Sequence, residues 1–192
     1  IVYNNDYDFE VGKAITLRNG EDVSIIATGT MVYNSLKAAE ILSEIYSIQA
    51  SVIDMHTIKP LDNSVIDLAC NSSLIVTVEE HSKIGGLGAA ISEYLSEKVK
   101  KPPQLILGLK DEYKHAGDYN YLIRQYGLTP EQIAESILLK YKTIKGYFIM
   151  TILVIAFIIY GIRIGIFRDK NVLIEYIKKF GIFAPTLFIF IQ

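Results

Sequence analysis

The residues with the clearest chemical potential stand together at the end of an apolar run. Glu79, Glu80 and His81 directly follow the β-branched segment 74–78. Two carboxylates can act as an acid–base pair, and a histidine can carry a proton near neutral pH. Adjacent residues that leave a strand point to opposite sides, however. We therefore expect one carboxylate to make structural contacts and the other to face solvent.

Three glycines follow this acidic pair and open a helical pattern. Gly85, Gly86 and Gly88 could bare the N–H groups of a helix N-terminus to an anion such as phosphate. Alternatively, they let the helix lie close to the strand, with at least one glycine at positive φ. The Gly-Gly-x-Gly spacing lacks the full dinucleotide fingerprint, which favours the packing interpretation. The candidates for an interface or an anion site are Glu79, Glu80, His81, Gly85, Gly86 and Gly88.

The remaining possible metal ligands are scattered along the chain. His56 and His115 could join His81 with Glu80 or Asp54, but no His-x-x-x-His or Cys-x-x-Cys spacing supports a metal site. The single cysteine, at position 70, excludes an internal disulfide and fits a reducing cytoplasm.

Strands that alternate with helices must position these residues. Short apolar runs predict strands at 13–18, 22–28, 50–54, 74–78 and 105–109. Three- and four-residue periodicity predicts helices at 31–47, 63–71, 87–99, 119–126 and 129–142. This order predicts a mostly parallel sheet between two helical layers.

Charge divides the chain into two parts. Residues 1–145 hold 14 Lys and Arg against 19 Asp and Glu, a net charge of −5. Residues 146–192 hold 5 against 2, a net charge of +3, and the two parts sum to −2. An acidic first part without a basic stripe argues against nucleic acid as a partner.

The second part begins with 17 uncharged residues, 146–162. That length is the lower limit for crossing about 30 Å of hydrocarbon, whereas a buried core helix of this length is rarely apolar all round. The apolar character continues past Arg163 to residue 167. We expect a candidate transmembrane helix at 146–167, an amphipathic helix at 168–179 and the start of a second apolar segment at 180–192.

Four stretches, in order, resemble the C-terminal domain of transketolases. They are FEVGKAITLRNGEDVSIIATGTMV (9–32), VIDMHTIKPLD (52–62), LIVTVEEHSKIGGLGAAISEYL (74–95) and YGLTPEQIAESIL (126–138). The chain departs from the family at 108–122, where an aromatic residue is usually followed by Ser-Gly. Here Tyr113 is followed by the run His115-Ala116-Gly117.

The resemblance implies a fold, and it implies that cofactor binding and dimer support belong to different domains. It implies a linker at 1–9 and a three-layer α/β/α domain at 10–142, with a five-stranded, mostly parallel sheet whose first strand is antiparallel. Transketolases transfer a ketol unit between sugar phosphates in the pentose phosphate pathway, using thiamine diphosphate and a divalent metal such as Mg²⁺. In the family, the first two domains hold the cofactor, and the C-terminal domain supports the dimer.

The resemblance therefore implies no catalytic, cofactor-binding or metal-binding residue in this chain. Upstream domains, or an N-terminal partner subunit, would complete a homodimeric enzyme in the cytoplasm. No diphosphate and metal motif of the Gly-Asp-Gly…Asn type occurs in the sequence.

The tail at 143–192 has no counterpart in the transketolase pattern. It resembles the beginning of DedA-like, SNARE-associated membrane proteins, which implies insertion into the cytoplasmic membrane through 146–167. One alternative is thus a membrane-anchored DedA-like protein that carries a non-catalytic α/β domain, or a fused or truncated reading frame. Another is an independent module that binds a nucleotide or phosphate at the glycine turn.

Overall fold

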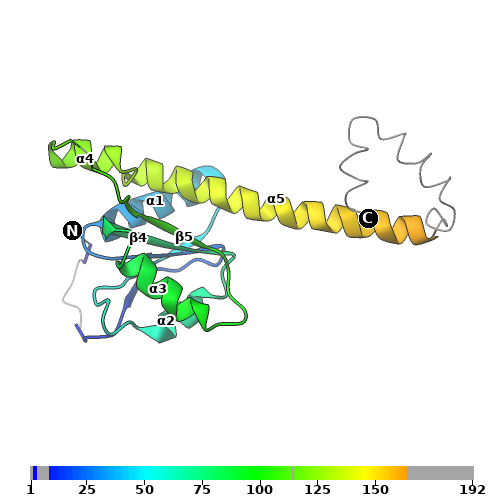
Figure 1. Cartoon of the computed structure of the whole chain (residues 1–192), viewed down its shortest axis with the longest axis horizontal. Helices are drawn as coiled ribbons and strands as arrows, with labels where there is room; N and C mark the ends of the chain where they lie inside the picture. The colour runs from blue at the N-terminus through cyan, green and yellow to red at the C-terminus, as the bar shows by residue number, and fades with distance from the viewer. Residues whose placement is uncertain (1, 4–8, 114, 164–192) are drawn as a thin grey trace. The chain divides into compact units, whose positions relative to one another are not determined.

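A five-stranded mixed sheet forms the centre of the domain in the computed structural model, which describes residues 2–3, 9–113 and 115–163 (Figure 1). Its strand order is β1-β3-β2-β4-β5. The strands are β1 (Ile15–Arg18), β2 (Val23–Ala27), β3 (Ala50–Asp54), β4 (Leu74–Ser82) and β5 (Gln104–Leu109). β1 runs antiparallel to β3, and the other neighbouring strands are parallel. The predicted five-stranded, mostly parallel sheet with an antiparallel first strand is confirmed.

Helices cover both faces of this sheet (Figure 1). They are α1 (Met31–Tyr46), α2 (Asn63–Ala69), α3 (Leu87–Ser96), α4 (Tyr119–Gln125) and α5 (Pro130–Arg163). On one face, α2 and α3 enclose a core with the strands; its buried residues are Ile26, Ile53, Met55, Ile66, Ala69, Ile75, Leu87, Ile91 and Leu95. On the other face lies α1, with Met31 and Leu42 fully buried. The three-layer prediction is thereby confirmed.

The central strands are apolar without interruption because both of their faces are covered. Every residue of β2 and β3 is buried, as expected for parallel strands between helical layers. The carboxyl end of β4, which pairs with β2, carries Glu79, Glu80 and His81 and leads to the glycine-rich turn, at the edge where ligands meet open α/β sheets.

The structure corrects two predicted boundaries. β4 does not stop at residue 78 but continues to Ser82, so that Glu79, Glu80 and His81 lie within the strand. The last helix does not end near residue 142, because α5 runs without a break to Arg163. The composition changes at Gly146, but one helical glycine costs only about 1 kcal/mol, too little to end a helix.

The chain forms two compact units, Ile1–Thr143 and Ile144–Gln192, and the division falls within α5. The predicted amphipathic helix at 168–179 and the apolar segment at 180–192 lie outside the described residues, as do 164–167 of the candidate transmembrane helix and most of the 1–9 linker.

Candidate functional site

The carboxylate of Glu79 fills the N-terminus of α3. The backbone N–H of Leu87 donates to Glu79 Oε2 at 2.7 Å, and the N–H of Gly88 donates to Oε1 at 2.8 Å. Glu79 is fully buried. A negative charge at this position satisfies two N–H groups that have no partner within the helix and complements the helix dipole. The chain therefore supplies its own anion where a phosphate would otherwise bind.

The glycines make this close approach feasible. Gly85 has φ +78°, a conformation that favours glycine. A Cβ on Gly86 would collide with the Glu79 carboxylate, and a Cβ on Gly88 would lie 2.5 Å from Ile106 Cγ2 of β5. The glycines thus serve contact among α3, β4 and β5, which matches the packing interpretation of their spacing.

Glu80 points to the opposite side of the sheet from Glu79. Its Oε2 accepts hydrogen bonds from the Thr30 hydroxyl at 2.6 Å and from the Tyr119 hydroxyl at 3.0 Å. Glu80 is exposed, in contrast to Glu79. The two carboxylates do not share a site, as expected from the alternation along a strand, and they are not arranged as an acid–base pair.

His81 lies in the last part of β4, two residues before an exposed turn at 83–86. Its side chain is 65% exposed, and its Nδ1 is 3.1 Å from the carbonyl oxygen of Ser82 and 4.0 Å from Glu79 Oε2. The turn is closed by the N–H of Ile84, which donates to the Ser82 hydroxyl. Ile84 itself is 69% exposed.

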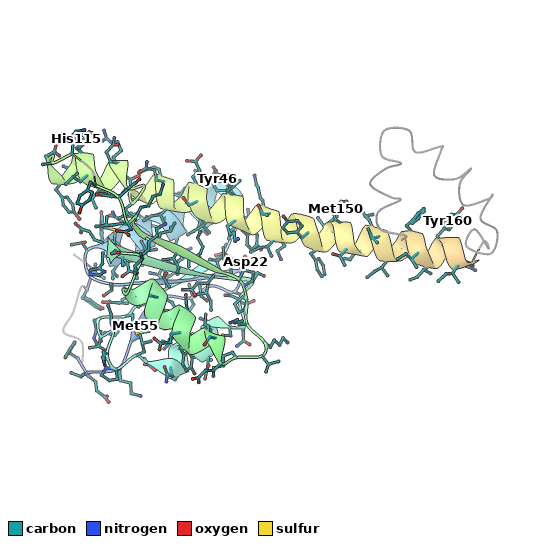
Figure 2. The ribbon with its side chains drawn as sticks, viewed as in Figure 1. Asp22, Tyr46, Met55, His115, Met150 and Tyr160 are labelled. Carbon is teal, nitrogen blue, oxygen red and sulfur yellow. The ribbon has the colours of Figure 1, made fainter. Side chains whose placement is uncertain are left out.

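The candidate metal ligands are not brought together. Among residues 2–3, 9–113 and 115–163, no three His, Cys, Asp or Glu side chains form a group that could hold a metal ion. Asp54, at the end of β3, accepts a hydrogen bond from the Tyr3 hydroxyl, and the ring of His56 packs on Phe9 with centroids 4.5 Å apart. His115 lies beside α4 (Figure 2).

Thiamine diphosphate, the cofactor that the resemblance implies for the complete enzyme, does not fit the glycine-rich turn at the N-terminus of α3. A diphosphate needs donors for its charge and a divalent metal. The N–H groups of Leu87 and Gly88 at the N-terminus of α3 already bind Glu79, and no metal-binding group accompanies them in the described part of the chain. No reaction step is therefore assigned to this domain.

The two hydrogen bonds that Glu80 accepts could not be predicted from the sequence. Thr30 and Tyr119 are 50 and 39 residues from Glu80 in the sequence. They meet it because β2 and β4 are neighbours, so that the loop after β2 lies beside the end of β4. The sequence carries no signal for that strand order, since β3 intervenes along the chain.

These features define an α/β domain covered on both faces, whose glycine-rich turn is occupied by its own carboxylate. A family model described as "Transketolase, C-terminal domain" matches residues 12–133. The chain belongs to the transketolase C-terminal domain family. The tail from residue 143 lies beyond the matched residues.

Two curated relatives are similar over most of this chain. The first is a "Putative transketolase C-terminal section" of Methanocaldococcus jannaschii, 40% identical over 74% of this chain and 45% of that protein. The second is one of the subunits of an apulose-4-phosphate transketolase from Phocaeicola vulgatus, 43% identical over 70% of this chain and 43% of that protein. This chain thus spans less than half the length of either relative.

A solved structure, "Split gene transketolase, inactive beta4 tetramer", has the same fold. Its TM-score is 0.66 at 35% sequence identity, and the match covers 74% of this chain and 45% of that chain. The relatives and this solved structure are named as transketolases or as parts of them.

Proposed function

We propose that this chain is the structural, partner-binding C-terminal section of a transketolase, which transfers a two-carbon ketol group between sugar phosphates in the pentose phosphate pathway. The observation that carries the proposal is the carboxylate of Glu79 in the N-terminus of α3. In a domain of this family, that arrangement leaves the glycine turn as a rigid packing element without room for an anionic ligand. The chain alone is inactive on this account.

The partner supplies the chemistry. Upstream domains, or an N-terminal partner subunit, hold thiamine diphosphate and Mg²⁺, and the complete enzyme is a homodimer in the cytoplasm. One relative is named as a C-terminal section and the other as a subunit, and both names support an enzyme divided between chains. The proposed domain limits are 10–142 for this section, with 1–9 as its linker.

The exposed turn after β4 is the proposed contact with the partner. Glu79 and the glycines at 85, 86 and 88 fix its base, and Glu80 and His81 precede it at the end of β4. Ile84 presents an apolar side chain at its tip. Exposed apolar groups held on a rigid turn are suited to protein interfaces, where a few buried side chains carry most of the affinity.

Reconstitution tests this proposal. The full chain is mixed with a separately purified thiamine-binding section of a transketolase, and ketol transfer and association are measured. We expect both to rise on mixing, and the I84D variant to bind at least about tenfold more weakly, because a buried charge replaces an apolar contact. The matched control is V99D, since Val99 is fully exposed and lies beyond the C-terminus of α3. No rise in activity or association would count against the proposal.

A second candidate function concerns the tail. We propose that 146–167 anchors the chain in the cytoplasmic membrane, which would make it a DedA-like protein with the α/β section as a passenger, or a fused reading frame. The observation that favours an anchor is that no residue of an 18-residue apolar window in the last described helix is buried. Cell fractionation tests this candidate, and recovery of the whole protein in the soluble fraction would eliminate it.

A further inference from the structure

The apolar part of α5 exposes side chains around its whole circumference (Figure 2). Tyr147, Phe148, Ile149 and Met150 are consecutive and are each more than half exposed. Consecutive residues of an α-helix are turned by about 100°, so four in a row cover every side of the helix. The pattern continues with exposed residues at 152, 153, 155, 158, 159, 160 and 162.

This distribution restricts what can cover the helix. A second helix or a sheet covers one stripe of residues spaced three and four apart and leaves the opposite side to water. A helix that lies in the membrane surface likewise needs a charged face toward water. Between Gly146 and Ile162 the sequence has no charged residue on any side. Only an apolar environment on all sides suits such a helix.

The backbone of this segment and the hydroxyl of Thr151 at its middle form hydrogen bonds within the helix. Its backbone continues as α-helix to Arg163. The helical conformation pairs backbone N–H and C=O groups with one another, as a hydrocarbon environment requires. The hydroxyl of Thr151 donates to the carbonyl oxygen of Tyr147 at 2.9 Å. The segment can therefore leave water without an unpaired hydroxyl at its middle.

The length and the ends of the segment match a bilayer. At 1.5 Å per residue, residues 146–163 extend about 27 Å, close to the roughly 30 Å of a hydrocarbon core. Tyr147 and Tyr160 stand near the two ends, where tyrosine prefers the interface. Lys145 and Arg163 flank the apolar stretch, and their long side chains can reach the headgroups.

We infer that residues 146–163 of α5 span a lipid bilayer, with lipid in contact on every side of the helix. This inference rests on the second function proposed above and specifies the mode of attachment. Lipid covers the apolar surface of the helix, rather than a second copy of the chain, and the helix crosses the membrane rather than lying in its surface.

Tryptophan scanning tests the mode directly, because the chain contains no tryptophan. The L153W and I155W variants place the probe at mid-segment, on positions about 200° apart around the helix. The full chain is reconstituted in phosphatidylcholine vesicles whose lipids carry bromine at the acyl-chain ends, and quenching of tryptophan emission is recorded. Y121W on α4, outside the apolar segment, is the matched control.

If the helix spans the bilayer, both mid-segment probes lose most of their emission. A third variant, F148W, places the probe near one end of the segment and should lose less. The control Y121W should keep its emission. Quenching of only one of L153W and I155W would overturn the inference, since it indicates a helix in the membrane surface or one side covered by protein. Absence of quenching in both would also overturn it. Membrane association in cell fractionation together with one-sided quenching would leave the anchor function standing while refuting the spanning mode.

Discussion

Replacing the buried carboxylate of Glu79 should weaken the domain far more than replacing its neighbour. In E79Q, the side chain keeps its size but has only one oxygen for the two N–H donors of Leu87 and Gly88. Its NH₂ group would face one of these donors, which would remain buried and unpaired. The adjacent substitution E80Q alters an exposed carboxylate and serves as the matched control.

The expected magnitude follows from the two hydrogen bonds. They measure 2.7 and 2.8 Å and are accepted by a charged group; such bonds contribute about 1.5–3 kcal/mol each, and a buried unpaired donor costs about 1–3 kcal/mol. The glutamine avoids the cost of burying a charge, which offsets part of the loss. We expect E79Q to lower the free energy of unfolding by about 2 kcal/mol and E80Q by no more than about 0.5 kcal/mol.

Urea unfolding of the full chain in a mild non-ionic detergent, followed by circular dichroism, measures both values. Amide hydrogen exchange supplies a local readout, because loss of the cap should speed exchange in the first turn of α3 before it affects β2. Equal stability of the E79Q and E80Q variants would refute the reasoning that the carboxylate of Glu79 holds the helix N-terminus.

Two further predictions concern packing and pH. G88A should destabilise the domain by about 1–3 kcal/mol through overpacking, because its Cβ would lie 2.5 Å from Ile106 and 2.8 Å from Thr77; the control G146A meets no atom within 4 Å and should cause no loss in the same urea assay. Burial opposes ionisation of Asp62, yet hydrogen bonds from the Ser64 hydroxyl and from the N–H groups of Ala14 and Ser64 lower its pKa below the ordinary 3.8. A lowered pKa gives stability that is present above pH 3.8 and is lost as the pH falls through the folded-state value. The stability difference between the wild type and D62N should therefore be constant near neutral pH and shrink in acid, and a difference that does not change with pH would contradict this.

The fold could be predicted from local patterns, because each pattern has a direct physical cause. The continuous apolar runs of β2 and β3 reflect burial on both faces. The place of Asp62 directly before a helical pattern predicts an N-cap, and its carboxylate does accept a hydrogen bond from the N–H of Ser64. The antiparallel first strand follows from the family resemblance rather than from periodicity.

The role of Glu79 could be predicted only in part. Alternation along a strand predicts that one of the two adjacent carboxylates makes structural contacts and that the other faces solvent. A Cβ on Gly88 of α3 would lie 2.8 Å from Thr77 Oγ1, so Thr77 faces α3, and Glu79, two residues further along β4, faces the same side. Alternation does not tell which carboxylate is buried or that α3 begins beside it, because both depend on how the strand and the helix pack together.

Calorimetric titration of thiamine diphosphate with Mg²⁺ into the full chain, alone and together with a thiamine-binding section of a transketolase, decides whether this domain is purely structural. We expect no heat of binding with the chain alone, and cofactor binding with ketol transfer once that section is added. Stoichiometric binding of thiamine diphosphate by the chain alone would show that the domain binds the cofactor itself and is not purely structural.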